Sequence, residues 1–176
     1  RNRDPRLRKQ DRQVMGLRFG ARSRPASMVS TWLNDLDGVG GDKSAGAAYF
    51  VGGYTGWPPV NTMEKFTFAS ASIETLSAVL ATARSHFAGT ESSSHGYAAG
   101  GYANGVGVNL DSIERLVFSS DSNAAISDTL SSARRALGAF ASANDGYWLG
   151  GTTGYGSWID TIDKTDFTDD ATAAIT

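Results

Sequence analysis

Few side chains in this sequence are of the types that carry out chemistry. The 176 residues include two histidines, His86 and His95, and no cysteine. Neither a multi-histidine metal site nor a thiolate site can be built from that supply. Residues 38–46 (GVGGDKSAG) have the glycines and the lysine of a phosphate-binding loop, but Asp42 stands where glycine is required and would repel phosphate. We therefore expect no catalytic residues, no metal and no cofactor.

The stretch IDTIDKTDFTDD near the end of the sequence is rich in carboxylates. Carboxylate clusters bind Ca²⁺, but a spacing of three does not match the known calcium loop, and on a strand it places successive side chains on opposite faces. We interpret the stretch as a solvated face, with calcium binding as the alternative. A carboxylate pair for glycoside hydrolysis also stays open, because its separation depends on the fold. The aspartates are Asp160, Asp163, Asp166, Asp169 and Asp170.

Aromatic side chains in loops are better candidates for binding, because carbohydrates stack on such rings. Each follows a glycine pair: Trp57 the first, Tyr102 the second, and Tyr155 and Trp158 the third. The alternative is that these rings cover strand ends or face another subunit.

Arg84 and Arg134 form a second candidate pair, 50 residues apart. A buried arginine can satisfy backbone carbonyls or a carboxylate of a neighbouring structural unit. The alternative is that both arginines bind an anion or a sugar in a central channel.

Composition indicates that short strands and turns position these side chains. Glycine is frequent at 21 residues and charged residues make up 19%, a mixture that favours strands and turns over long helices. No apolar run approaches the roughly 20 residues of a membrane helix. We therefore expect no membrane insertion.

Charge divides the sequence into a basic arm and an acidic body. Residues 1–29 carry nine arginines and lysines against two aspartates, whereas the remainder carries seven basic and sixteen acidic residues. Residues 1–27 lack a sustained apolar period, which indicates an extended or disordered arm. Such an arm can contact nucleic acid or an acidic surface. Because no aromatic residues stand among residues 1–18 to stack on bases, we expect an acidic neighbouring subunit, and not nucleic acid, as its partner.

Three blocks recur along the body with nearly one period. Glycine pairs stand at 52/53, 100/101 and 150/151, each behind a short apolar run such as YFV. The blocks MEKFTF, IERLVF and IDKTDF, which start at residues 63, 113 and 162, follow them. A third block occurs twice, at 80–89 and 130–139. This order predicts units at 49–96, 97–146 and a partial unit at 147–176, preceded at 28–48 by a linker or degenerate half-repeat.

Within a unit the patterns predict strands. Residues 49–51 form a short apolar run typical of a buried strand, and the glycine pair behind it permits unusual backbone angles and close approach of neighbouring units. Tyr49, Tyr97 and Tyr147 are expected to cover the faces of their units. The segment SASIETLSAVLATAR has helical spacing, but its serines and threonines favour a strand and a turn. ESSSHG and SANDG are typical of hairpin loops.

A unit of about 50 residues with these blocks resembles a kelch repeat. The matching residues are Val51-Gly52-Gly53-Tyr54, Met63 to Phe66, Arg84 and His86 in the first unit, and Gly100-Gly101-Tyr102, Ile113 to Leu116 and Arg134 in the second. Ala136 replaces the histidine, and the usual late tryptophan is absent, with Ile73 and Ile126 near its place. The blocks also resemble degenerate kelch-like repeats of bacteriophage structural and tail-fibre proteins.

The resemblance implies an all-β fold of kelch-like β-propeller blades, each of four short antiparallel strands and too few in one chain to close a ring. It also implies a non-catalytic structural or receptor-binding component of a virion, such as a tail fibre. Its partners would be copies of itself, neighbouring structural subunits and a cell-surface glycan. The alternatives are an intracellular kelch-type adaptor for proteins and a carbohydrate-active propeller enzyme.

Overall fold

The protein is all-β in the part that its computed structural model describes, which comprises residues 30–34, 46–54, 58–103 and 107–175. These residues form fifteen strands and no helix. The strands make four antiparallel sheets, and none of the sheets closes into a barrel. The predicted basic arm at 1–27 lies outside the described residues, and so do Trp57 and positions 35–45.

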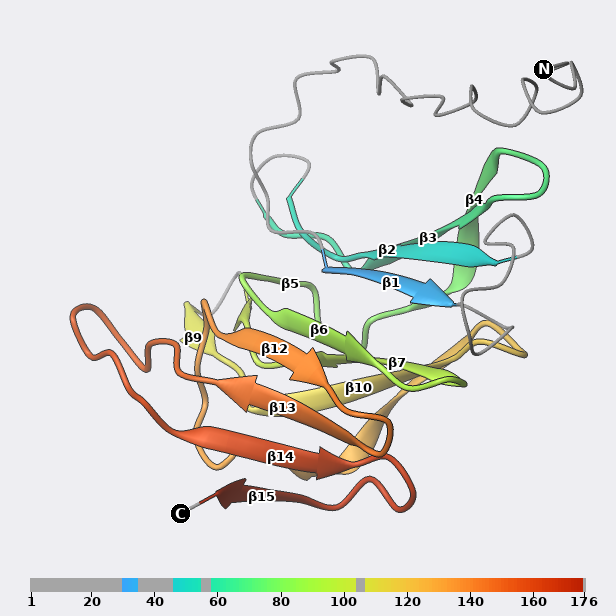
Figure 1. Cartoon of the computed structure of the whole chain (residues 1–176). Coiled ribbons are helices and arrows are strands. Elements are labelled where there is room, and N and C mark those ends of the chain that lie inside the picture. The colour runs from blue at the N-terminus through green and yellow to red at the C-terminus, as the bar shows by residue number, and fades with distance from the viewer. Residues whose placement is uncertain (1–29, 35–45, 55–57, 104–106, 176) are drawn as a thin grey trace, which may run out of the picture.

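Three of the sheets have four strands each, joined in the order of the sequence (Figure 1). Each strand pairs antiparallel with the next strand of its own sheet, and in sheet 2 β7 pairs with β10. Sheet 1 contains β1 (Ser30–Asn34), β2 (Ala47–Val51), β3 (Thr62–Thr67) and β4 (Ser72–Val79). Sheet 2 contains β6 (Ala88–Glu91), β7 (His95–Ala99), β10 (Ser112–Val117) and β11 (Ser122–Thr129). Sheet 3 contains β12 (Gly138–Ala141), β13 (Asp145–Leu149), β14 (Ile162–Asp166) and β15 (Thr172–Ile175).

A small fourth sheet lies at one end of sheet 2. Its strands are β5 (Arg84–Ser85), β8 (Tyr102–Ala103) and β9 (Val108–Asn109). β5 belongs to the linker between sheets 1 and 2, whereas β8 and β9 belong to the connection between β7 and β10. This sheet therefore joins a linker to a loop.

Each four-stranded sheet begins one strand before the strand that ends at its glycine pair. β1 pairs with β2 in the place that β6 and β12 take beside β7 and β13. The described part of residues 28–48 thus supplies the first strand of sheet 1, and residues 138–175 give sheet 3 four strands. The segment with helical spacing forms β4, as the serine and threonine content predicted. The hairpin loops predicted at ESSSHG and SANDG join β6 to β7 and β12 to β13.

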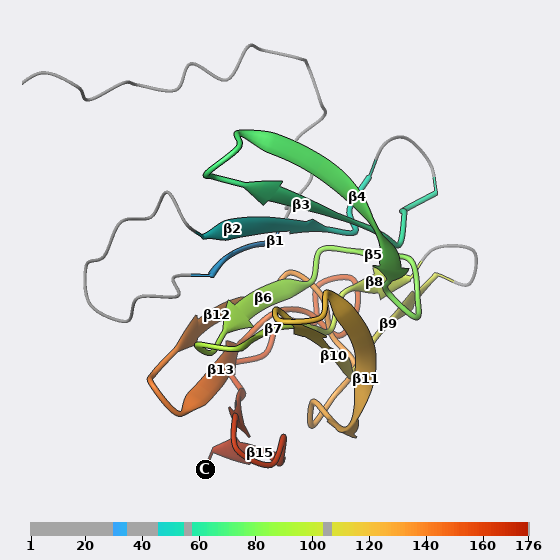
Figure 2. The same cartoon turned by 90° about the vertical axis from the view of Figure 1, so that its right-hand side faces the viewer.

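The sheets are arranged like a fan. Their first strands lie side by side, because β6 contacts both β1 and β12. From these strands the sheets diverge toward β4, β11 and β15 (Figure 2). Two apolar cores fill the spaces between the sheets and hold the fan together.

The two cores are built from equivalent residues. The core between sheets 1 and 2 contains Tyr49, Val51, Met63, Leu80, Phe87, Ala98, Leu116 and Phe118. The core between sheets 2 and 3 contains Tyr97, Ala99, Ile113, Leu130, Leu137 and Trp148, with Phe167 packed against it. Tyr49 and Tyr97 thus cover the faces of their sheets, as predicted. Tyr147 occupies the same place on sheet 3, where its face is only half covered.

The glycine pairs lie where the linkers pass closest to the sheets. All three pairs have positive φ, with Gly100 at 67° and Gly101 at 106°. A Cβ at Gly101 would lie 2.8 Å from the carbonyl oxygen of Ser85, and one at Gly100 would lie 2.7 Å from that of Arg134. Both reasons for glycine that the sequence suggested, unusual backbone angles and close approach, are confirmed.

Candidate functional site

Arg84 joins sheet 1 to sheet 2 through a buried ion pair. Its Nη2 lies 2.6 Å from Oε1 of Glu114 on β10, and the two side chains are 1% and 0% exposed. The other guanidinium hydrogens are donated to the carbonyl oxygens of Thr82, Gly100 and Ser112 and to the Ser112 hydroxyl. A charge with this many partners stays ionised in the interior and fixes the linker against the next sheet.

Arg134 repeats the ion pair one unit later but makes fewer hydrogen bonds, because its Nε and Nη1 are buried without a partner. Its Nη2 lies 2.8 Å from Oδ2 of Asp163 on β14, and neither side chain is exposed. It also donates to the carbonyl oxygen of Trp148 at 3.1 Å. Burial lowers the pKa of both arginines, whereas the facing carboxylates of Glu114 and Asp163 act in the opposite direction. The structure therefore shows both arginines bound to a carboxylate of the neighbouring sheet, and their binding of an anion or sugar stays a hypothesis.

A second set of polar contacts joins the sheets near the turn before the last strand of each. Tyr49 on sheet 1 donates its hydroxyl hydrogen to Oδ1 of Asp121 at 2.7 Å, and Nζ of Lys65 lies 2.7 Å from Oδ2 of the same residue. Asp121 belongs to the turn between β10 and β11 of sheet 2. Its carboxylate therefore bonds at once to a phenol and a cation of the preceding sheet.

Sheets 2 and 3 repeat this contact. Tyr97 donates to Asp170 at 3.0 Å, and Arg115 forms an ion pair with the same aspartate. Asp170 and Asp121 have positive φ of 63° and 52°, in equivalent turns. A phenylalanine beside each turn stacks on the tyrosine: Phe118 on Tyr49 and Phe167 on Tyr97, at ring distances of 5.2 and 4.9 Å.

These contacts shift the titration of the two tyrosines. Burial, and after it the hydrogen bond to Asp121, raises the pKa of the Tyr49 phenol. Burial and Asp170 raise the pKa of Tyr97 in the same way, against a smaller opposing effect of Arg115. Both phenols are therefore held protonated as hydrogen-bond donors.

The loops that connect the second and third strands of the sheets lie at one end of the fan. They include the connection from β13 to β14, which projects from the body (Figure 1). In this connection Tyr155 is fully exposed and Trp158 is 71% exposed. Thr152 fixes the start of the connection, because its backbone bridges both Arg135 and Trp158. The loop thus presents two rings to solvent.

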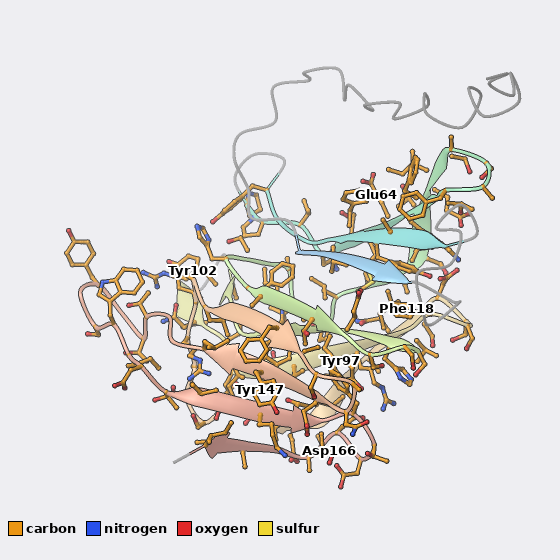
Figure 3. The ribbon with its side chains drawn as sticks, in the orientation of Figure 1. Glu64, Tyr97, Tyr102, Phe118, Tyr147 and Asp166 are labelled. Atoms are coloured by element: carbon orange, nitrogen blue, oxygen red, sulfur yellow. The ribbon has the colours of Figure 1, made fainter. Side chains whose placement is uncertain are left out.

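Tyr102, which is labelled in Figure 3, does not belong to this loop. It lies on β8, and the guanidinium of Arg135 stands 5.0 Å from the centre of its ring. Arg135 also donates to Oδ1 of Asn109 at 2.7 Å. Tyr102 is half-buried by this cation–π contact. Of the predicted aromatic site residues, Tyr155 and Trp158 lie together on one exposed loop, Tyr102 is partly covered, and Trp57 lies outside the described residues.

The interpretation of the acidic stretch as a solvated face is wrong for Asp163. Its carboxylate is buried and accepts hydrogen bonds from the backbone and hydroxyl of Ser131 besides its ion pair with Arg134. Asp166 is used locally, accepting from the backbone N–H and hydroxyl of Thr168. Within the described ranges no group of three or more histidine, aspartate or glutamate residues is placed to hold a metal ion.

Sequence reasoning did not predict that four carboxylates join neighbouring units: Glu114, Asp121, Asp163 and Asp170. A signal for two of them was present, because Glu114 and Asp163 are both the second residue of their repeated block and follow Arg84 and Arg134 by 30 and 29 residues. No comparable signal marked Asp121, since the equivalent position of the first unit is Ala71.

Comparisons with known proteins add no relative. A scan against protein-family models gives no match, and a search of curated proteins gives none either. Among the described residues no helix is long and apolar enough to cross a membrane.

Proposed function

We propose that this chain contributes three kelch-like blades of a β-propeller and acts as a non-catalytic structural or receptor-binding component of a viral particle, such as a phage tail fibre. Three equivalent four-stranded sheets, fanned from neighbouring first strands, support the propeller. The resemblance of the repeated blocks to degenerate kelch-like repeats of phage proteins supports the particle. Many repeated surfaces of modest affinity then bind strongly through multivalency.

One observation carries the non-catalytic part of the proposal. Among the described residues the four buried charged side chains pair with each other between a linker and the following sheet: Arg84 with Glu114, and Arg134 with Asp163. Charged side chains paired with each other in the interior stabilise a scaffold, which favours a structural over a catalytic role for them. In the described part of the chain the most exposed large apolar residues instead lie on the β13–β14 loop, as Tyr155 and Trp158.

The receptor-binding part rests on these two rings. Exposed aromatic side chains on a loop anchored at Thr152 present flat apolar faces with a polar edge, which suits stacking against the ring of a sugar. A cell-surface glycan is therefore the proposed ligand. The second candidate function is an intracellular adaptor, in which the same two rings would bind a protein partner.

Glycan binding can be tested on an immobilised array of cell-surface oligosaccharides. We expect the purified chain to retain a subset of glycans, and the double variant Tyr155→Ala/Trp158→Ala to lose them. Val79→Ala is the matched control, because it shortens a 43% exposed apolar side chain at the end of β4. Absence of any retained glycan, together with capture of a defined host protein through the same two rings, would favour the adaptor.

A further inference from the structure

The face of sheet 3 that points away from sheet 2 is apolar and partly exposed. The equivalent faces of sheets 1 and 2 are each covered by the following sheet. Tyr147, Leu149 and Ile162 are partly exposed there. Their counterparts on sheet 2, Tyr97, Ala99 and Ile113, are fully buried, because sheet 3 packs on them. Phe140 stacks on Tyr147 at 4.7 Å and is 53% exposed, and Ile175 is 48% exposed. The repeat thus indicates what belongs on this face, namely another sheet of the same kind.

The face of sheet 1 that points away from sheet 2 is the complementary surface. Glu64 lies on it (Figure 3), and strand alternation places Phe50 and Phe66 beside it. Phe68 follows at the end of β3, in the position of Phe118 and Phe167. Those two phenylalanines stack on the tyrosine of the preceding sheet. Phe68 is only half-buried, whereas Phe118 is 6% exposed.

We propose that a second copy of this chain covers both faces, head to tail, with Phe68 of each copy stacked on Tyr147 of the other. The proposal rests on the proposed function, because it takes the sheets to be propeller blades. Two copies then close a ring of six four-stranded sheets about a twofold axis, within the range of about four to eight blades that propellers have. The partner is thereby a second copy of this chain, bound at a defined junction.

The contact made by the turn before the last strand, which both junctions within a copy have, is missing from the junction between copies. Asp121 and Asp170 bond to the tyrosine and the cation of the preceding sheet. The equivalent turn residue of sheet 1 is Ala71, which has the same positive φ of 50°. Tyr147 and Lys164 would therefore meet no carboxylate from this turn of the partner copy. Lys164 instead pairs with Asp145 of its own sheet at 3.2 Å.

Because this carboxylate is missing, adding one should make the two copies associate more tightly. In Ala71→Asp the new carboxylate would reach Tyr147 and Lys164 of the partner copy, and aspartate tolerates positive φ better than alanine. A charge-assisted hydrogen bond contributes enough to lower the dissociation constant of the dimer about tenfold or more. Adding Lys164→Glu should cancel this gain, because two carboxylates would then face each other.

The experiment is sedimentation equilibrium on the full 176-residue chain. We expect a mass twice the 18.5 kDa of one chain, tighter association for Ala71→Asp, and weaker association for Phe68→Ser and for Tyr147→Ser. Tyr155→Ser is the matched control, because this exposed tyrosine lies outside both faces. Far-ultraviolet circular dichroism checks that each variant is folded.

Three outcomes would overturn the proposal. The first is a monomer in both the unmodified chain and Ala71→Asp, which would leave the faces to a different protein. The second is a dimer weakened by Tyr147→Ser and unaffected by Phe68→Ser, which would mean that two copies of sheet 3 pack on each other. The third is a dimer whose dissociation constant is unchanged by both Phe68→Ser and Tyr147→Ser. Glycan binding is measured separately on the same samples, so failure of the proposed function is distinguishable from failure of the dimer.

Discussion

Arg84 and Glu114 form a buried ion pair of 2.6 Å between a linker and a sheet that lie 30 residues apart in the sequence. Replacing Arg84 by methionine leaves the Glu114 carboxylate buried without its cation. The free energy of unfolding should fall by about 3–5 kcal/mol, since an uncompensated buried charge costs that much. Urea denaturation followed by circular dichroism measures the change.

Two further variants serve as controls for this ion pair. Arg115→Met removes an ion pair whose arginine is 37% exposed, and such a pair contributes about 1 kcal/mol or less. The double variant Arg84→Met/Glu114→Leu should regain part of the stability lost in Arg84→Met, because no charge is left unpaired, while the donors of Ala81 and Asn123 lose their acceptor. A double variant as unstable as the single one would contradict this account.

Gly101 should be one of the positions least tolerant of a side chain. Its φ is 106° and a Cβ would lie 2.8 Å from the carbonyl oxygen of Ser85 and 2.9 Å from Cβ of Phe87. Gly101→Ala should therefore lower the free energy of unfolding by about 2 kcal/mol or more through strain and overpacking. The control is Gly138→Ala, because nothing lies within 4 Å of a Cβ built there. Equal effects of the two substitutions in thermal unfolding would show that close approach is not what requires Gly101.

The repeated local pattern could be predicted from the sequence because its causes are local. A glycine pair behind an apolar run demands positive φ wherever it occurs, and the three pairs confirm it. The segment at Ser72–Val79 forms a strand despite its helical spacing. Its backbone pairs with β3, and most of its side chains are exposed to solvent, so no apolar helix face has to be buried. A short stretch of sequence was therefore enough to predict both the glycine conformations and this strand.

The contacts that join the sheets could not be predicted in the same way because their partners are remote. Tyr49 and Asp121 are 72 residues apart, and Tyr97 and Asp170 are 73 apart. Asp170 stands among other aspartates, where nothing in the sequence separates it from a solvated neighbour such as Asp169. Which carboxylate is buried depends on where the following sheet packs, and only the fold supplies that information.

His95 should make the stability depend on pH near neutrality. Burial, and after it the charge of Arg115, lowers the pKa of His95 below its ordinary value of 6.5, while Asp170 acts weakly in the opposite direction. The folded state therefore prefers the neutral imidazole. Its contribution is fully present above pH 6.5 and is lost as the pH falls below that value toward the lowered pKa of the folded state.

The measurement is urea denaturation at a series of pH values between about 5 and 8. The free energy of unfolding should decline on the acid side in the unmodified chain and decline less in His95→Gln, which keeps a polar side chain at the same place. His86→Gln is the matched control for the other histidine. An identical acid-side decline in His95→Gln would rule out this residue as the cause.

Tyr49 and Tyr97 should resist ionisation at alkaline pH until the sheets separate. Burial and the aspartates Asp121 and Asp170 raise the pKa of both phenols above the ordinary value of 10.0. An unfolded chain loses these protons near pH 10 and the folded chain does not, so the free energy of unfolding declines as the pH rises above 10. Absorbance at the phenolate band follows the titration of the six tyrosines. In the double variant Tyr49→Phe/Tyr97→Phe the late-titrating part of this signal should disappear, and its persistence would place the protected phenols elsewhere.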